Sequence, residues 1–246
     1  MNHLPVWKPL RKPGEISETR LINAILDGTF PINSLLPGER DLAALLGVTR
    51  PTLREAMQRL ERDGWLDIRH GKPTRVRDFW REGKLGVSIT MAQQQASLPA
   101  DYVVNLLSVR VLLAPDYVSS AVEKKSAAVL EALEQTRSLT EDALEFTRFD
   151  WQLHWLLTIH SGNPFYTHFI NSVQPLYDLL GEKYFRFPQT RAHSRSFYDQ
   201  LKLTAEKGEG MAAEALTKRV MRESRDLWLQ LVSEGDRILN VEKRLA

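Results

Sequence analysis

One segment, GVTRPTLREAMQRLERDGWLDIRHGKPTRV (residues 47–76), constrains the fold more than any other part of the chain. Thr49 is a favourable helix N-cap, Pro51 suits the first helical turn, and Gly64 is a typical residue just past a helix end. Residues 65–76 then alternate around a glycine-containing turn, which is the pattern of two short strands. The segment therefore predicts a helix followed directly by a small β-hairpin.

Two shorter amphipathic helices precede this segment. The first follows residue 15 and ends at Gly28, and the second covers Arg40–Leu46. The tight break at Gly47-Val48 separates the second helix from the third. Helix, helix, tight turn, helix and hairpin is the element order of a winged helix-turn-helix, which we predict for residues 1–80. A core of about 65 residues is small, so we expect it to rely on a partner domain.

The third helix and the hairpin carry the residue types that read DNA. The N-terminal residues of a recognition helix enter the major groove, where arginine bonds guanine and threonine hydroxyls reach phosphates. A hairpin tip with glycine can approach the minor groove closely. The candidate DNA-binding residues are Arg40, Thr49, Arg50, Thr52, Arg54, His70, Gly71 and Lys72. Arg59 and Arg62, further along the helix, are interpreted as ordinary solvated surface.

Charge supports this interpretation through its placement rather than its sum. The chain has a formal net charge of only +2, and residues 40–77 hold nine basic against five acidic residues. That local excess is modest, so the position of the basic residues on the helix and hairpin is the stronger evidence. A winged helix used only for protein contacts is the competing interpretation, but it would not need basic residues converging on one face.

The remainder of the chain has a helical pattern. Residues 81–98 hold few large apolar residues and are interpreted as a linker with a short helix. Helices are expected near 100–123, 126–138, 140–160, 164–183, 190–207 and 210–234. The expected fold is therefore mainly α: an N-terminal winged helix-turn-helix at 1–80, a linker at 81–98, and a C-terminal all-α helical bundle, the effector domain, at 99–246.

Several function classes are excluded by what the sequence lacks. Cysteine is absent, which rules out disulfides and thiolate metal sites. No apolar run approaches the roughly 20 residues of a membrane helix, and the N-terminus has no apolar core of signal-peptide length. We therefore expect a cytoplasmic protein without membrane association. A glycine-rich phosphate loop, a GxSxG elbow and an HExxH motif are all missing, so we expect no enzyme and no catalytic residues.

The stretch LLPGERDLAALLGVTRPTLREAMQRLERDGWLDIRHGKPTRV resembles the N-terminal domain of the GntR family of transcription regulators. NLLSVR (105–110), SGNP (161–164) and the spacing to Trp228 are similar to the FadR subfamily, whose members regulate fatty-acid metabolism. The resemblance implies that the candidate DNA-binding residues named above contact DNA. Pro51 departs from the family pattern, which has threonine there, so one contact of this chain should differ from those of its relatives.

The resemblance also implies a mechanism. Members bind double-stranded operator DNA as homodimers, and two recognition helices related by a two-fold axis require a pseudo-palindromic site. Long-chain acyl-CoA in the helical domain lowers the affinity for DNA. The implied function is a transcription regulator that represses fatty-acid degradation genes, with activation of synthesis genes as a second role. No cofactor is implied, and the acyl-CoA is an effector ligand.

An acyl-CoA effector needs an apolar tunnel for its chain and polar or cationic groups for its head. The candidate effector-binding residues are Arg110, Tyr177, Tyr184, Met221, Ser224 and Trp228. Arg110 could pair with a phosphate, and the aromatic residues suit a pocket mouth. Two positions depart from the subfamily, since Met221 replaces a glycine and Ser233 a lysine. The larger methionine predicts a shorter or differently routed acyl chain.

A metal-dependent effector site is the alternative. Many GntR relatives hold a metal ion with one aspartate and three histidines and bind carboxylates. Asp150 and His154 lie four residues apart in FDWQLHW, on one helical face, as such a site requires. The positions of the other two histidines read Tyr198 and Met221, so no metal site is predicted. A regulator that responds to a metal-bound small carboxylate remains the alternative function.

Overall fold

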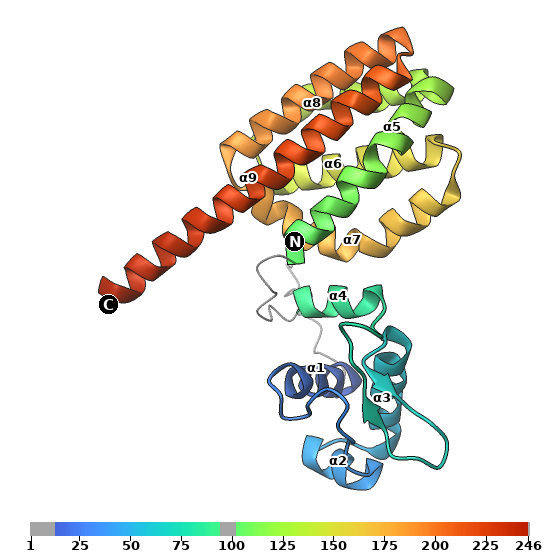
Figure 1. The fold of residues 1–246 in the computed structure, drawn as a ribbon, viewed down its shortest axis with the longest axis vertical. Coiled ribbons are helices and arrows are strands. Elements are labelled where there is room, and N and C mark those ends of the chain that lie inside the picture. The colour runs from blue at the N-terminus through green and yellow to red at the C-terminus, as the bar shows by residue number, and fades with distance from the viewer. Residues whose placement is uncertain (1–12, 94–101, 246) are drawn as a thin grey trace, which may run out of the picture. The chain divides into compact units, whose positions relative to one another are not determined.

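The computed structural model describes residues 13–93 and 102–245, with side chains over 14–92 and 102–231. The chain divides into two compact units, residues 1–96 and 97–246 (Figure 1). Each has its own hydrophobic core. The division matches the predicted order of a small N-terminal domain followed by a larger helical one.

The first unit is a winged helix-turn-helix. Its helices are α1 (Pro13–Leu26), α2 (Glu39–Leu46), α3 (Arg50–Asp63) and α4 (Leu85–Gln93). Strands β1 (Leu66–Asp67) and β2 (Arg75–Val76) pair antiparallel, and Leu35 adds a single bridge to β2. The fully buried apolar residues of this core come from α1, α2, α3 and the hairpin segment that follows, and they are Leu21, Leu42, Leu53, Ala56, Leu60, Trp65, Leu66 and Val76.

Helix ends position the reading helix as the sequence predicts. Gly47 ends α2 with a left-handed φ of 67°, a conformation that costs glycine little. Thr49 then caps α3, since its Oγ1 accepts a hydrogen bond from the Thr52 N–H at 3.4 Å. Pro51 sits in the first turn of α3, where its missing N–H is not needed. The sharp turn between α2 and α3 therefore follows directly from the residue types in it.

The predicted linker is partly built into the first unit. Helix α4 lies within the predicted linker, and its residues Val87 and Met91 are buried. The Lys84 N–H donates to the carbonyl of Asp63 at 3.1 Å, which ties this segment to the end of α3. The first domain therefore extends beyond residue 80, because a few well-placed apolar residues suffice to cover the end of α3. Residues 94–98 of the predicted linker lie outside the described residues.

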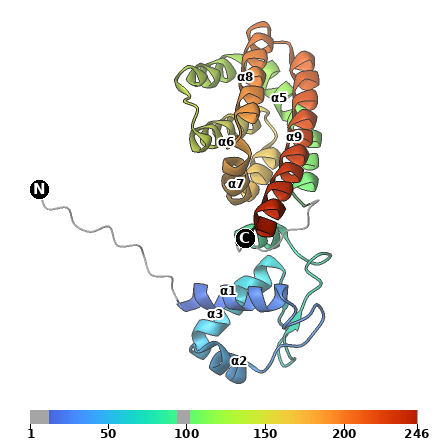
Figure 2. The same ribbon diagram turned by 90° about the vertical axis from the view of Figure 1, so that its left-hand side faces the viewer.

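The second unit is an all-α bundle, as predicted. It consists of α5 (Tyr102–Glu134), a short 3₁₀ helix η1 (Gln135–Ser138), α6 (Ala143–His160), α7 (Pro164–Phe185), α8 (Pro188–Lys207) and α9 (Gly210–Leu245). Helix α5 is kinked at Lys125, the position where a helix break is expected. Helix α9 runs alongside α5 in both views (Figures 1 and 2).

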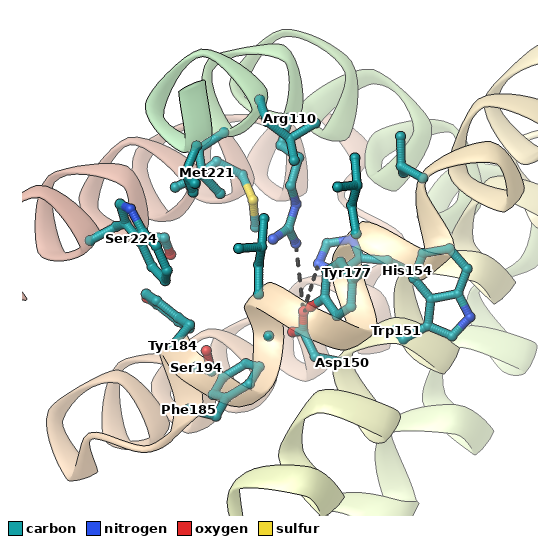
Figure 3. Close-up of a pocket in the computed structure, with 18 of the residues that line it drawn as sticks. Arg110, Asp150, Trp151, His154, Tyr177, Tyr184, Phe185, Ser194, Met221 and Ser224 are labelled. Atoms are coloured by element: carbon teal, nitrogen blue, oxygen red, sulfur yellow. Dashed lines mark hydrogen bonds and ion pairs between the residues drawn. The ribbon is translucent and has the colours of Figure 1, made fainter. Parts of the chain in front are cut away.

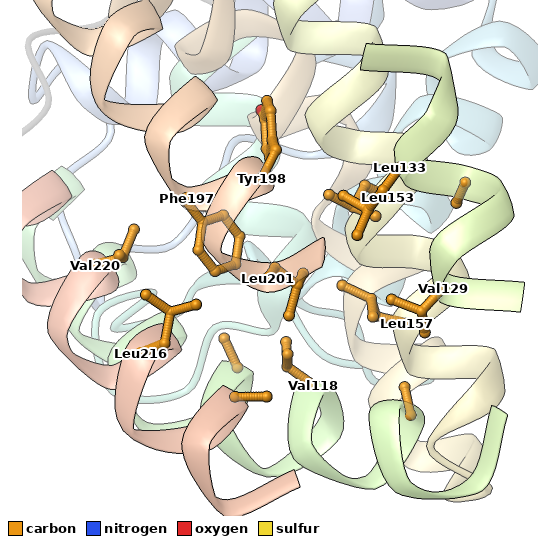
Figure 4. Close-up of a cluster of buried hydrophobic side chains, with 14 of the residues drawn as sticks. Val118, Val129, Leu133, Leu153, Leu157, Phe197, Tyr198, Leu201, Leu216 and Val220 are labelled. Carbon is orange, nitrogen blue, oxygen red and sulfur yellow. The ribbon is translucent and has the colours of Figure 1, made fainter. Parts of the chain in front are cut away.

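The core of the bundle lies where α5, α6, α8 and α9 meet. Figure 4 shows Val118 and Val129 of α5 facing side chains of the other three helices. Leu153 and Leu157 lie one turn apart on α6, and Leu201 of α8 is fully buried. In the part of the chain that the structure describes, no helix is long and apolar enough to cross a membrane.

Candidate DNA-reading surface and effector cavity

The N-terminal turn of α3 presents its polar side chains to solvent. Thr49, Arg50 and Arg54 are exposed, and Thr52 is half-buried. The hydroxyls of Thr49 and Thr52 hydrogen-bond each other at 2.9 Å, so the cap orders both. Among the described residues, Arg50 has no hydrogen-bond or ion-pair partner. Its guanidinium is therefore free to meet a base edge or a phosphate.

The other two candidate arginines of this surface are paired with acids of α2. Arg54 donates from Nε to Glu39 Oε2 at 2.6 Å, and their side chains are 58% and 35% exposed. Arg40 donates from Nε to the adjacent Asp41 at 3.2 Å, with both side chains largely exposed. Such exposed pairs contribute little stability, and both guanidinium groups remain accessible to DNA.

The hairpin tip is the second part of the surface. His70, Gly71 and Lys72 are all exposed. Gly71 has a φ of 71°, a left-handed conformation that favours glycine, and nothing would lie within 4 Å of a Cβ there. The Lys72 N–H donates to the carbonyl of Arg69 at 3.1 Å, which closes the turn. The tip is open and basic, as the sequence predicts.

Arg59 and Arg62, on later turns of α3, each lie beside an acidic residue. Arg59 pairs with Glu18 of α1 at 2.7 Å, so its charge connects two helices of the unit. Arg62 is exposed beside Asp63, with 3.6 Å between Nε and the carboxylate. For Arg59 the structure adds a structural partner that the sequence analysis missed, because the two residues are 41 positions apart.

An ion-pair network at the base of the hairpin is a further feature that sequence reasoning missed. Arg75 of β2 donates to Asn33 at 2.7 Å and to Glu82 at 2.9 Å, and its guanidinium lies 3.5 Å from Asp67. The hydrogen bond from Arg75 holds the pKa of the Glu82 carboxyl below its ordinary value. The network orders the hairpin relative to the segment that leads into α4.

A cavity lies inside the bundle, lined by residues of α5 to α9. The space between its lining side chains, with the open solvent at its mouth included, amounts to about 950 Å³. All six predicted effector-binding residues line it: Arg110, Tyr177, Tyr184, Met221, Ser224 and Trp228. Figure 3 shows Tyr184 and Ser224 towards one end and Asp150 and His154 towards the other. The sequence analysis therefore gathered residues that the fold does bring together.

Asp150 is the centre of a buried polar cluster in this cavity. It accepts hydrogen bonds from the hydroxyls of Tyr177 and Tyr198, the latter at 2.8 Å. Arg110 Nη2 lies 3.5 Å from its Oδ2, with side chains 19% and 6% exposed. Burial opposes ionisation of Asp150, but the neighbouring His154, Arg110 and tyrosines outweigh it and hold the pKa below its ordinary value.

The surroundings of Arg110 therefore differ from those expected of an arginine that is free to bind a ligand phosphate. Burial opposes its charge, yet Tyr177 and Asp150 outweigh that effect, and the pKa of the guanidinium is raised. It also lies over the Tyr177 ring, 5.3 Å from the centroid. The positive charge is thus already compensated by Asp150. The structure places it within the wall of the cavity, where a ligand phosphate would have to compete with that carboxylate.

His154 is neutral in this cluster at neutral pH. Burial lowers the pKa of its imidazole to about 4, against the opposing influence of Asp150. The Tyr117 hydroxyl and His154 Nδ1 form a hydrogen bond of 2.8 Å. Among the described residues, no group of three or more potential metal ligands comes together. Tyr198 instead donates to Asp150, at one of the two positions where the metal-dependent alternative requires a histidine.

The opposite end of the cavity is aromatic. The rings of Tyr184 and Trp228 stack with centroids 6.4 Å apart, and Ser224 lies one turn before Trp228. Met221 is buried and forms part of the wall. Ser233 lies in the part of α9 whose side chains are outside the described residues.

Other lining residues, including Trp151, Ser194 and Phe197, were not singled out from the sequence. They come from α6 and α8, and helical periodicity marks them only as inward-facing. Nothing in the periodicity distinguishes a residue that lines a cavity from one that fills a core. Only the resemblance to a ligand-binding subfamily distinguishes cavity-lining residues from core residues. It identified six of the lining positions.

Comparison with known proteins matches each of the two units to a protein family. The model of the gntR family of bacterial regulatory proteins matches residues 17–76, and that of the FadR C-terminal domain matches residues 77–239. A protein of Shewanella sp. (strain ANA-3) called fatty acid metabolism regulator protein is 37% identical over 219 residues, covering 89% of this chain and 91% of its own. A protein of the same name from Klebsiella pneumoniae subsp. pneumoniae is 35% identical over 233 residues. The match covers 94% of this chain and 98% of that protein.

A solved structure supports the fold alone. Lar, which controls the expression of the Listeria monocytogenes agr system, is 18% identical with a TM-score of 0.58. The comparison covers 91% of this chain and all of that one. Matching family models across both units, together with relatives of over 30% identity along most of the chain, establish the assignment. The chain belongs to the GntR family of bacterial transcription regulators, which are not enzymes, and its second unit is a FadR C-terminal domain.

Proposed function

We propose that this chain regulates the transcription of fatty-acid metabolism genes and that long-chain acyl-CoA releases it from operator DNA. Its relatives carry the name of fatty acid metabolism regulators. The exposed arginines of α3 and the open basic hairpin tip supply the DNA-binding surface. The cavity in the bundle supplies a place for the effector. As a DNA-binding regulator, the protein acts in the cytoplasm.

The observation that carries the effector assignment is the lining of the cavity. Most of its wall is apolar, contributed by Val103, Leu106, Leu107, Phe169, Ile170, Val173, Leu176, Leu180 and Val220. Such walls suit an acyl chain, because burying methylene groups is favourable by about 0.8 kcal/mol each. The aromatic end, with Tyr184, Ser224 and Trp228, offers hydrogen-bonding and stacking groups to the thioester end of the ligand.

Arg110 has a different part in this proposal from that of a free phosphate binder. Because Asp150 already compensates its charge, Arg110 holds the polar cluster together and shapes the cavity wall. The phosphate-bearing head of the acyl-CoA then lies towards the aromatic end. Met221 narrows the cavity on the side of α9, so chain length is limited there.

The regulator is proposed to act as a homodimer on a pseudo-palindromic operator. Two copies of α3 related by a two-fold axis read two half-sites of DNA. Repression of degradation genes and activation of synthesis genes then differ only in where the operator lies. The ligand acts through differential affinity for the DNA-bound and released states, since a ligand that binds both equally shifts nothing.

Reciprocal titration tests this mechanism. A labelled duplex selected by the protein from a random-sequence library is titrated by fluorescence anisotropy, with and without palmitoyl-CoA. Palmitoyl-CoA binding is then measured with and without the duplex. Each ligand should weaken the other by the same factor, because coupling between two sites is reciprocal. Coenzyme A alone is the control, and it should leave DNA affinity unchanged.

Two results would overturn the proposal. Equal DNA affinity with and without palmitoyl-CoA would remove the acyl-CoA response. Recovery of a divalent metal and a small carboxylate from the purified protein, in place of an acyl-CoA, would favour the metal-dependent alternative.

A further inference from the structure

The pairing between Arg54 and Glu39 has a geometry that bears on base reading. The hydrogen bond to Glu39 Oε2 uses the Nε of Arg54, at 2.6 Å. The terminal Nη1 and Nη2 hydrogen-bond no other residue in the described part of the chain. These two nitrogens are one of the edges with which arginine bonds guanine O6 and N7 in parallel. The contact with Glu39 therefore occupies one edge of the guanidinium and leaves the guanine-reading edge open.

The backbone of Glu39 has a defined place at the start of α2. Glu39 is the first residue of α2 and follows the N-cap residue Gly38. A carboxylate at a helix N-terminus is stabilised by the helix dipole. Helices α2 and α3 pack against each other, and Leu42 of α2 and Leu53 of α3 are fully buried. The backbone of Glu39 is therefore fixed relative to that of Arg54, and the 2.6 Å hydrogen bond joins the two side chains.

We infer that Glu39 is a positioning residue that sets the DNA specificity of this regulator through Arg54. This inference rests on the proposed function, since it requires specific operator binding. Anchoring Nε reduces the freedom of a long side chain, so less entropy is lost when its terminal edge meets a guanine. Arg54 thus arrives at the major groove already oriented for one base.

The same carboxylate disfavours non-specific binding. On DNA without a guanine in the right place, Arg54 contributes mainly through attraction to phosphate. Glu39 cancels much of that attraction, because it places a negative charge beside the guanidinium. Glu39 therefore widens the gap between specific and non-specific affinity, at the expense of affinity for DNA in general.

The test compares Glu39→Gln with the matched control Asp41→Asn. Both substitutions remove one negative charge from the first turn of α2 and release one arginine of the DNA-binding surface. Asp41 pairs with Arg40 of α2, the helix that crosses the DNA backbone, whereas Glu39 pairs with Arg54 of the recognition helix. Affinity is measured for a duplex selected by the wild-type protein and for a scrambled duplex of the same composition. Asp41→Asn should raise both affinities alike. Glu39→Gln should lower the ratio of specific to non-specific affinity by about twofold to fivefold.

Arg54→Ala reveals whether Glu39 acts through Arg54. A panel of single-base-pair variants of the selected duplex identifies the position at which Arg54→Ala stops discriminating. Glu39→Gln should weaken discrimination at that same position. In an Arg54→Ala background, Glu39→Gln and Asp41→Asn should become equivalent. Thermal unfolding of each variant shows whether the fold is intact, and Glu39→Gln should melt like the wild type.

The outcomes separate the inference from the function on which it rests. If the wild type prefers the selected duplex but Glu39→Gln and Asp41→Asn have the same specificity ratio, Glu39 does not position Arg54. The inference also fails if Glu39→Gln relaxes a base pair that Arg54→Ala leaves intact. A wild type with no preference for any duplex overturns the proposed function itself.

Discussion

The candidate DNA-reading arginines of α3 and the cavity arginine of the second unit have opposite surroundings. In the first unit Arg50 is exposed and Arg54 is 58% exposed, with only one carboxylate nearby. In the second unit the Arg110 side chain is 19% exposed and faces a buried Asp150. A charge in water costs little to keep and can accept a new partner, whereas a buried charge depends on the partner it has. The same residue type is thus available for a new partner in one unit and committed to an existing partner in the other.

The largest effect that tests this contrast is expected from Arg110→Ala. Removing the guanidinium leaves the buried Asp150 carboxylate without its cation, which costs about 3–5 kcal/mol of folding free energy. Denaturant unfolding monitored by circular dichroism measures the loss. Arg110→Met combined with Asp150→Asn should recover most of it, because no unpaired charge then remains. Equal destabilisation by the single and double variants would show that packing, and not charge, controls this site.

The pH dependence of stability should be dominated by the same cluster. His154 has a folded-state pKa of about 4, below its ordinary 6.5, so the unfolded chain binds the extra proton first. Its contribution to stability is therefore complete above pH 6.5 and is lost as the pH falls towards 4. The total is about 3 kcal/mol at about 1.4 kcal/mol per pH unit. Because Asp150 also has a lowered pKa, further loss follows at lower pH.

Denaturant unfolding between pH 7 and pH 4 checks this, with His154→Gln against His160→Gln. His154→Gln should flatten the profile between pH 6.5 and 4. His160 lies at the end of α6, outside the polar cluster, and His160→Gln is the matched control for loss of a histidine from the same helix. A profile that is unchanged in His154→Gln would mean that another group controls acid sensitivity.

Arg50→Ala should show the reverse behaviour to Arg110→Ala. Loss of a bidentate base contact is expected to cost about 1–3 kcal/mol of operator affinity and to relax specificity at one base pair. Stability should change by less than about 0.5 kcal/mol, because the side chain is exposed and unpaired. Anisotropy with operator variants and denaturant unfolding measure the two quantities. Loss of stability without loss of operator affinity would break the contrast between the two units.

The two units also differ in how far the sequence predicts them. The elements around α3 follow from signals close together in the chain, such as Gly47, Thr49, Pro51 and Gly64. The exposed candidate DNA-binding residues can be predicted from the same spacing, because the position of a residue on a helix face is enough to predict that it is exposed. Local patterns therefore suffice for the fold and the candidate residues of the first unit. The ion pairs of the first unit could not be predicted from local patterns, because Arg54 and Glu39 are 15 positions apart on different helices.

The cavity depends on contacts across much longer separations. Tyr177 and Tyr198 reach Asp150 from 27 and 48 positions away, and Tyr117 reaches His154 from 37. Helical periodicity gives the bundle and its breaks, but it does not say which inward residues meet. The six lining residues were found through a family resemblance. The compensation of Arg110 by Asp150 required the fold, so its expected role as a free phosphate partner could not be corrected from sequence.

The smallest expected effect concerns Lys72 at the hairpin tip. Its ammonium is exposed. If the hairpin tip meets DNA as proposed, Lys72 is a point charge near the DNA backbone and should add affinity without reading sequence. Lys72→Ala should weaken binding to selected and scrambled duplexes alike and reduce the slope of log affinity against log salt by about 0.9. Anisotropy titrations over a range of salt concentrations measure that slope, with Arg62→Ala as an exposed control on the far turn of α3. A change in the specificity ratio without a change in slope would mean that Lys72 reads bases, and the tip would then share the role of Arg50.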